Sequence, residues 1–231
     1  MDESLLDSVR SGDRRALSRA ITLVEQGQDS PGLPDPSAVI GVTGPPGAGK
    51  STLISALIDT MRSRGETVAV LAVDPSSPIS GGALLGDRIR MQGHVDDEGV
   101  YVRSMATRGH LGGLAESARD AVSLLSVAGF DRVLVETVGV GQSEVEVMGL
   151  AEVVVLVVGP SWGDQVQADK AGIVEIAHVF VVNKGDRPGV SEVQRALRDA
   201  SEGRNAGVFV TTATTGEGVT ALLDEIDRLL G

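Results

Sequence analysis

The residues best suited to chemistry lie in one glycine-rich segment, Gly44-Pro45-Pro46-Gly47-Ala48-Gly49-Lys50-Ser51. This segment matches the pattern G-x-x-x-x-G-K-[ST] in full. An apolar run of strand type precedes it at 38–43, and residues 51–64 have the character of a helix. Backbone N–H groups in such a turn, together with the helix N-terminus, form an anion site. The segment therefore predicts a phosphate-binding loop.

Several residues of this loop have expected tasks when a nucleoside triphosphate is bound. Lys50 is expected to reach the β- and γ-phosphates, Ser51 to hold Mg²⁺, and Thr52 to touch the α-phosphate. The glycines allow a close backbone approach that a Cβ would hinder. The residues expected to bind the nucleotide through this loop are Gly44, Gly47, Ala48, Gly49, Lys50, Ser51 and Thr52.

A second motif, Asn183-Lys184-Gly185-Asp186, follows the apolar run 179–182 and has the N-K-x-D pattern of GTPases. The Asp186 carboxylate can accept two hydrogen bonds, from the N1–H and the 2-amino group of guanine. Adenine lacks this donor pair and would leave the carboxylate unpaired, which costs more than a lost contact. The motif therefore predicts GTP and GDP as ligands.

The remaining guanine contacts are expected from the same loop and from the loop after the last strand. The stem of Lys184 can lie across the base, and Asn183 can tie neighbouring loops together. Thr212 and Ala213 suit the loop whose backbone N–H meets guanine O6. Lys50 and Lys184 are two of only three lysines in the chain; the third is Lys170.

Acidic residues are predicted at the ends of strands, where a metal bound to the phosphates would lie. The run 133–139 has the pattern E-x-x-G, with Glu136 and Gly139, in place of the usual D-x-x-G of small GTPases. Gly139 can give its N–H to the γ-phosphate. Asp74 and Asp87 are further acidic candidates, although either can instead be a capping residue. Mg²⁺ takes few direct protein ligands, so we expect outer-shell roles for most of these carboxylates.

These assignments define two overlapping sets of expected functional residues. Those expected to act in catalysis are Lys50, Asp74, Asp87, Glu136 and Gly139. Those expected at the metal are Ser51, Asp74, Asp87 and Glu136. Ras-like enzymes place a water-orienting Gln directly after the glycine of this motif. Val140 occupies that position here, and the nearby Gln142 is either a displaced substitute or a polar loop residue. We therefore expect slow intrinsic hydrolysis.

Composition limits the class of protein. The chain has 231 residues, 42% of them hydrophobic but only 2% aromatic, which suits a buried parallel sheet rich in Val, Leu, Ile and Ala. The absence of Cys excludes disulfides and thiolate metal sites. The net charge of −12 argues against nucleic acid as a partner. No apolar run long enough for a membrane span and no signal peptide are evident, so we expect a cytoplasmic protein with no membrane partner.

The pattern along the chain predicts an α/β fold with a doubly wound, mostly parallel sheet. Helical spacing at 3–26 and a linker at 29–36 predict an N-terminal helical segment over 1–36, followed by the nucleotide domain over 37–231. The expected strands are 38–43, 67–73, 131–137, 152–158, 179–182 and 206–211, with a seventh near 100–103. The expected helices of the nucleotide domain are 51–64, 111–128, 165–177, 191–201 and 217–230.

Eight segments, in order along nearly the whole chain, carry a resemblance to a known family. They are GDRRAL from Gly12, GVTGPPGAGKSTL from Gly41, VDPSSP from Val73, GGALLGDRIRM from Gly81, ATRGHLGGLA from Ala106, ETVGVGQSE from Glu136, GDQVQADKAGIVEIA from Gly163 and VVNKGD from Val181. The chain resembles the MeaB/ArgK-type GTPases that accompany adenosylcobalamin-dependent methylmalonyl-CoA mutase. These belong to the G3E branch of P-loop GTPases, within the SIMIBI type.

The resemblance implies a G-protein chaperone that gates adenosylcobalamin loading and protects or reactivates a B12-dependent acyl-CoA mutase. It further implies a cobalamin adenosyltransferase as a second partner. Asp74 and Asp87 would belong to a first switch and Glu136 and Gly139 to a second. The segment 164–170 would form a third, in which Lys170 could pair with an acidic group. The family's C-terminal helical extension forms a homodimer, whereas this sequence stops at Gly231, so the dimer is an open expectation.

Three other functions share this architecture. A metal-delivery GTPase would need clustered soft or imidazole ligands, and the chain has no Cys and three scattered His. A transport-system kinase would need a second substrate pocket. A nucleotide-dependent interaction module would bind GTP without releasing phosphate. No D-x-H-x-x-G motif is present, so we do not expect the chain to hold B12 in that way.

Overall fold

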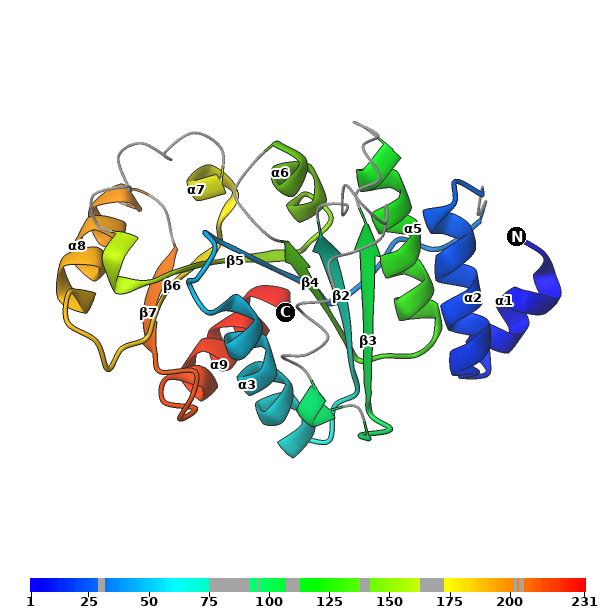
Figure 1. The fold of residues 1–231 in the computed structure, drawn as a ribbon, viewed down its shortest axis with the longest axis horizontal. Coiled ribbons are helices and arrows are strands. Elements are labelled where there is room, and N and C mark those ends of the chain that lie inside the picture. Colours follow the sequence, from blue (N-terminus) through cyan, green and yellow to red (C-terminus); the bar gives the residue numbers. More distant parts are fainter. Residues whose placement is uncertain are drawn as a thin grey trace.

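In the computed structural model, a seven-stranded parallel sheet runs through the molecule (Figure 1). The structure describes residues 1–28, 32–74, 92–94, 96–106, 113–137, 142–162, 173–201, 203 and 206–231. The strands are β1 (Val39–Thr43), β2 (Val68–Asp74), β3 (Val100–Ala106), β4 (Arg132–Thr137), β5 (Val153–Val158), β6 (Val179–Asn183) and β7 (Gly207–Thr211). Their order is β3-β2-β4-β1-β5-β6-β7, with every pair parallel. The predicted doubly wound fold is confirmed.

Helices cover both faces of this sheet. They are α1 (Glu3–Arg10), α2 (Arg14–Glu25), α3 (Lys50–Ser63), α5 (Gly113–Val127), α6 (Gln142–Met148), α7 (Ile173–Ile176), α8 (Val190–Ala200) and α9 (Val219–Leu230), with short 3₁₀ turns η1 (Gln92–His94) and η2 (Pro160–Trp162). Figure 1 shows α3 and α9 on one side and α5 to α8 on the other. Helix α6 was not predicted, because seven residues are too short for a clear helical period. Of the helix expected at 165–177, α7 is the described part.

The strand sequences explain why both faces are covered. In β5 and β6 every residue is buried, so successive side chains, which point to opposite faces, all need an apolar layer. On one face Leu53, Ile54 and Leu57 of α3 pack with Val155 and neighbouring strand residues. The opposite face buries the alternate strand residues against the other helices, with Phe180 among its largest buried side chains.

The two N-terminal helices lie within the segment 3–26, where helical spacing was predicted. Ala16, Leu17, Ala20, Ile21 and Val24 are the buried residues of α2, as helical spacing requires. The Asp13 side chain begins this helix by accepting hydrogen bonds from the backbone N–H groups of residues 15 and 16. Gly27, with φ of 83°, follows the end of this helix.

Helix α2 is joined to the rest of the molecule through α5 and the edge strand β3. The Ser18 and Tyr101 hydroxyls lie 3.0 Å apart, and the Arg103 guanidinium lies 3.3 Å from the Glu25 carboxylate. The residues of α2 belong to the same apolar core as α5. The helices before residue 36 therefore share a core with the residues that follow. The domain boundary near residue 36 stays a prediction.

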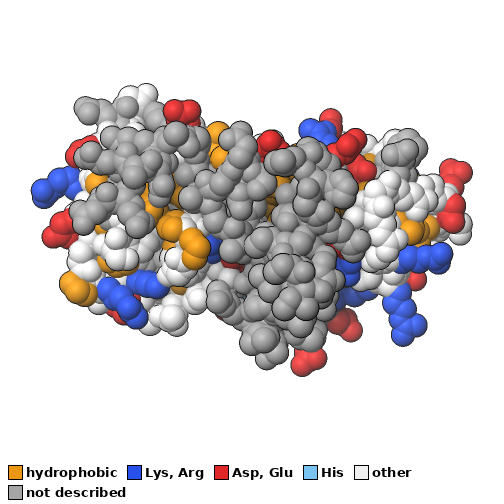
Figure 2. Space-filling model, turned by 45° about the horizontal axis from the view of Figure 1, so that its top comes forward, with side chains coloured by type: hydrophobic (Ala, Val, Ile, Leu, Met, Phe, Trp, Pro, Cys, Tyr) orange, Lys and Arg blue, Asp and Glu red, His pale blue; other side chains and the backbone are white. Residues whose placement is uncertain are grey.

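Surface charge is mixed in sign. Figure 2 shows Asp and Glu interspersed with Lys and Arg on the described part of one face, so this part carries no continuous field of one sign. Within the described residues, no helix combines the length and apolar character needed to cross a bilayer.

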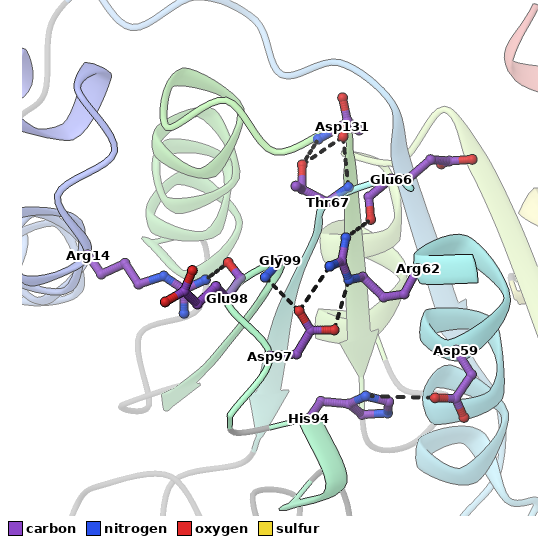
Figure 3. A network of polar contacts seen from close by, with 10 residues as sticks. All are labelled: Arg14, Asp59, Arg62, Glu66, Thr67, His94, Asp97, Glu98, Gly99 and Asp131. Atoms are coloured by element: carbon purple, nitrogen blue, oxygen red, sulfur yellow. Dashed lines mark hydrogen bonds and ion pairs between the residues drawn. The ribbon is translucent and has the colours of Figure 1, made fainter. Parts of the chain in front are cut away.

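A polar network lies at the turns that precede β2, β3 and β4, and Arg62 joins it to the end of α3 (Figure 3). The Arg62 guanidinium donates to both carboxylate oxygens of Asp97, at 2.9 and 3.0 Å, and to the Glu66 carbonyl at 2.7 Å. The Asp131 carboxylate accepts from the backbone N–H and the hydroxyl of Thr67, both at 2.7 Å. These bonds fix the turns that enter β2, β3 and β4.

Two of the three histidines, His94 and His178, have structural contacts. His94 is buried, and its Nε2 lies 2.9 Å from the Ser55 hydroxyl of α3. The Nδ1 of His178 accepts a hydrogen bond of 3.0 Å from the backbone N–H of Val154, at the start of β5. These contacts hold the ends of secondary-structure elements and explain both residues without a role in chemistry.

The hydrogen bonds to Asp131 predict an acid-sensitive contribution to stability. The Thr67 backbone and hydroxyl donors hold the pKa of Asp131 below its ordinary value of 3.8. Because the folded pKa is depressed, the ionised carboxylate stabilises the fold above the unfolded pKa, and this is lost as pH falls through the folded pKa. We expect Asp131→Asn to lower the urea midpoint at pH 7, and the difference from the parent protein to shrink as the pH is lowered below 3.8, in urea titrations at a series of pH values. Asp199→Asn, at an exposed site on α8, is the control. A difference that persists at low pH would contradict the linkage.

Candidate functional site

The two predicted nucleotide motifs meet at the carboxyl ends of the central strands. β1 ends at Thr43 and leads into the phosphate loop, while β6 ends at Asn183 and leads into the guanine motif. β5 lies between these strands in the sheet. In open parallel sheets, ligands bind in the crevice beyond the carboxyl ends, and the motifs lie there.

The phosphate loop is preorganised around its lysine. Lys50 begins α3, and Gly49 before it has a left-handed backbone with φ of 92°. The Lys50 ammonium is buried and donates to the carbonyls of Gly44 and Pro45, at 2.9 and 3.3 Å. The loop therefore curves around the cation, which lies beside the N-terminus of α3.

Two loop glycines are required by their surroundings. A Cβ on Gly44, whose φ is 143°, would lie 1.9 Å from the backbone carbonyl oxygen of Val157 in β5. A Cβ on Gly49 would lie 2.5 Å from the side-chain amide nitrogen of Asn183. Both separations are below any normal contact, so a larger residue would move the loop away from its neighbouring strands.

Asn183 connects the two motifs, as predicted. Its side-chain amide donates to the carbonyls of Ala48 and Gly49 at 3.1 and 3.3 Å, and its oxygen accepts from the Thr211 hydroxyl and the Ala213 N–H at 3.1 and 3.2 Å. The side chain is buried and uses both ends of its amide. It therefore holds the phosphate loop, β6 and the loop after β7 in one arrangement.

Lys184 lies over the phosphate loop in a strained conformation. Its φ is 63°, in the left-handed region that non-glycine residues seldom adopt, and its ammonium donates to the Gly47 carbonyl at 2.6 Å. A cavity of about 120 Å³ lies beside it. The lining residues are Gly49, Thr52, Asn183, Lys184, Asp186, Arg187, Thr212, Ala213 and Thr214. This set brings together every residue of the predicted guanine site, with Asp186 exposed to an incoming base.

The structure also joins two of the predicted metal residues. The Ser51 hydroxyl donates to the Glu136 carboxylate at 2.8 Å, and both side chains are buried at the ends of α3 and β4. A hydroxyl and a carboxylate are hard oxygen donors of the kind that Mg²⁺ prefers. Among the described residues no cluster of three acidic or imidazole groups is present. The pair fits Mg²⁺ bound mainly through water and phosphate.

The other predicted residues lie either at the ends of described elements or outside the described residues. Asp74 is the last residue of β2, at the same edge of the sheet, and Gln142 is the first residue of α6, so its interpretation as a loop residue is wrong. Asp87 and Gly139 lie outside the described residues, as do the family-motif residues Arg108, His110, Asp164 and Lys170. Thr211, Arg187 and Trp162 also lie at or beside the site and were not predicted. Of these three residues, only Trp162 could have been singled out from the sequence. It is the one tryptophan in the chain, and large apolar side chains are usually buried.

This geometry agrees with a match to a family model. The model described as methylmalonyl Co-A mutase-associated GTPase MeaB matches residues 15–230. The chain belongs to the MeaB family of GTPases. A putative GTPase from Pyrococcus abyssi is 47% identical to this MeaB-family chain, over 98% of the chain and 75% of that protein. GTPase ArgK from Escherichia coli is 42% identical, over 77% of the chain and 57% of that protein.

One further relative and two solved structures are also similar to the chain. A mouse protein named methylmalonic aciduria type A homolog, mitochondrial, is 40% identical over 80% of the chain and 47% of that protein. Among solved structures, one named LAO/AO transport system kinase has a TM-score of 0.73 at 27% identity, covering 99% of the chain and 76% of that structure. The hydrogenase maturation factor HypB of Archaeoglobus fulgidus has a TM-score of 0.61 at 17% identity, over 99% of the chain and 98% of that structure, and shows the shared fold.

Proposed function

We propose that this MeaB-family chain hydrolyses GTP to GDP and phosphate as a chaperone of an adenosylcobalamin-dependent acyl-CoA mutase, such as methylmalonyl-CoA mutase. The observation that carries this proposal is the family match over residues 15–230. The name of the mouse relative, which refers to methylmalonic aciduria, supports it. In this role the nucleotide state gates cofactor loading and protects or reactivates the mutase. The adenosyltransferase partner and the homodimer stay predictions.

The site geometry supports the proposed handling of GTP. The Asp186 carboxylate accepts from the N1–H and amino group of guanine, while the Lys184 stem covers the base. The backbone N–H groups of the phosphate loop and the Lys50 ammonium bind the phosphates and stabilise the charge that develops on them. Asn183 keeps base and phosphate sites in register through the contacts it makes to both.

Ser51 and Glu136 are the residues that would hold Mg²⁺ in this proposal. When bound, the ion neutralises phosphate charge and orients the phosphoryl oxygens. Asp74 is proposed to contribute from the end of β2 through water, and Asp87 and Gly139 retain their predicted roles in the metal shell and at the γ-phosphate. Slow hydrolysis by the chain alone follows from the lack of a Gln at position 140.

The Ser51–Glu136 pair allows a direct test of the metal assignment. Glu136→Gln keeps the size of the side chain but removes its charge. We expect the Mg²⁺ concentration for half-maximal hydrolysis to rise about tenfold or more, as for other changes close to a bound ion. A Mg²⁺ titration at saturating GTP measures this. Glu192→Gln, at an exposed position of α8, is the matched control. An unchanged Mg²⁺ requirement in Glu136→Gln would remove Glu136 from the site.

A transport-system kinase is the second candidate. The solved structure with the TM-score of 0.73, which is named as such a kinase, favours it. An enzyme of this kind would transfer phosphate to a protein or small-molecule acceptor in place of water. Radiolabel from γ-labelled GTP would then appear on the acceptor. The metal-delivery function and the interaction module remain alternatives, separated by bound-metal analysis and by phosphate release.

The deciding experiment measures GTP hydrolysis by the purified chain, alone and with a B12-dependent mutase, with ATP as the control nucleotide. Assays at low and high salt allow for the net charge of −12. We expect slow, GTP-specific turnover that rises with the mutase. Hydrolysis that is indifferent to the mutase would retain the GTPase chemistry and reject the proposed partner. Binding without phosphate release, even with the mutase, would favour the interaction module.

A further inference from the structure

A second cavity, of about 700 Å³, lies outside the phosphate loop. Its apolar wall consists of the only tryptophan in the chain and four prolines: Trp162, Pro45, Pro46, Pro160 and Pro188. The volume is in the range of small-molecule sites, roughly 300–1,000 Å³. Proline rings and a buried indole have little conformational freedom to lose, so this wall is formed before any ligand arrives. We call this space the Trp162 cavity.

The polar side chains of the Trp162 cavity are suited to an anion. Lys184 and Arg187 contribute two cations, and Ser161 a hydroxyl. The described residues that line the cavity include no Asp or Glu, although the chain has 32 acidic and 20 basic residues. In a strongly acidic protein, a concave surface with positive charge alone attracts negatively charged ligands.

The indole of Trp162 is a fixed part of the apolar wall. Only 3% of this residue is exposed, and its Nε1 nitrogen has less than 1 Å² of accessible surface. A ligand oxygen in the cavity therefore does not reach the N–H, and the residue contributes its apolar ring to the lining. Aromatic rings of this kind supply a large contact area to an apolar ligand.

The cavity is adjacent to the nucleotide site but has a different lining. It lies between the outer turn of the phosphate loop, the 3₁₀ turn after β5, and the turn after β6. It shares Lys184 and Arg187 with the guanine cavity. Lys50, Ser51 and Asp186, which are expected to bind the phosphates, metal and base, do not line it. A ligand there would leave those groups available.

We propose that the Trp162 cavity binds an organic anion with an apolar body, at the same time as the guanine nucleotide. The anionic group pairs with Arg187 and Lys184, and the apolar body packs between the prolines and the indole. Because Pro46 and Gly47 belong to both the cavity and the phosphate loop, the bound anion alters nucleotide affinity. This site goes beyond the proposed GTPase function and does not depend on the identity of the mutase.

The test uses 8-anilinonaphthalene-1-sulfonate, which is an organic anion with an apolar aromatic body, as the probe. Its fluorescence is titrated with the native chain in saturating GDP and Mg²⁺, and energy transfer from Trp162 is followed. We expect saturable binding that GDP does not displace. Arg187→Glu should weaken binding about tenfold or more, through loss of a charge-assisted contact. Arg195→Glu, the same charge change at an exposed site on α8, should not.

Two further measurements make the result decisive. Trp162→Leu keeps an apolar side chain but removes the aromatic ring from the wall, and should weaken binding of the probe, read from the probe's own emission. The uncharged analogue N-phenyl-1-naphthylamine should bind about tenfold more weakly than the sulfonate. Displacement of the probe by GDP, equal effects of Arg187→Glu and Arg195→Glu, or equal affinity for the uncharged analogue would each overturn the proposal. Circular dichroism and urea unfolding confirm that each variant is folded.

Discussion

Asp186→Asn should reverse the base preference of the protein from guanine to xanthine. In the proposed site the Asp186 carboxylate accepts two donors of guanine, whereas an amide there would offer one acceptor and one donor. The amide donor faces the guanine amino group, so one hydrogen bond is lost and two donors are opposed. Xanthine has a carbonyl at the same position and can accept from the amide. We expect GDP affinity to fall about 100-fold or more, equivalent to about 3 kcal/mol, and XDP affinity to exceed GDP affinity.

Equilibrium titrations with fluorescent GDP and XDP analogues measure this change. Asp186 is exposed at the opening of the guanine cavity, so the variant should unfold at the same urea concentration as the parent protein. Asp199→Asn, which removes the same charge from an exposed site on α8, should leave both affinities unchanged. If Asp186→Asn binds GDP as tightly as the parent, the guanine assignment of Asn183–Asp186 is wrong.

Lys50→Met should abolish most GTP hydrolysis while leaving the fold intact. The Lys50 ammonium is held by the Gly44 and Pro45 carbonyls at the start of α3, where it is positioned for the phosphates. Met has a similar length and preserves the packing of the buried stem. Loss of one preorganised charge from a phosphoryl-transfer site typically lowers turnover about 100- to 1,000-fold. The two carbonyls lose a donor, so we also expect about 1 kcal/mol of destabilisation.

Single-turnover hydrolysis at saturating GTP separates the chemical step from nucleotide binding, and urea unfolding reports the stability. Arg195→Met, which removes one positive charge from an exposed position of α8, is the matched control and should retain full activity. Hydrolysis by Lys50→Met within a factor of about two of the parent would show that the phosphates bind elsewhere.

Much of the architecture could be predicted, because it depends on local patterns. The apolar runs of β1, β5 and β6 are short and rich in valine, so they predict buried parallel strands. Alternation with helical segments then predicts the doubly wound class. The pattern failed at α6, whose seven residues begin at Gln142, because one to two turns of helix contain too few apolar positions for a period to be recognised.

The amino-acid sequence by itself determined the nucleotide chemistry, because the phosphate loop and the Asn183–Asp186 motif are contiguous segments whose own backbone forms most of each site. Only the tertiary structure decided which distant residues meet. The Ser51–Glu136 hydrogen bond, the Asn183 contacts to Ala48 and Ala213, and the cavity beside Trp162 each join separate strands and loops. Such contacts depend on strand order and register, which are set by the packing of the whole sheet, and no local pattern of residues encodes them.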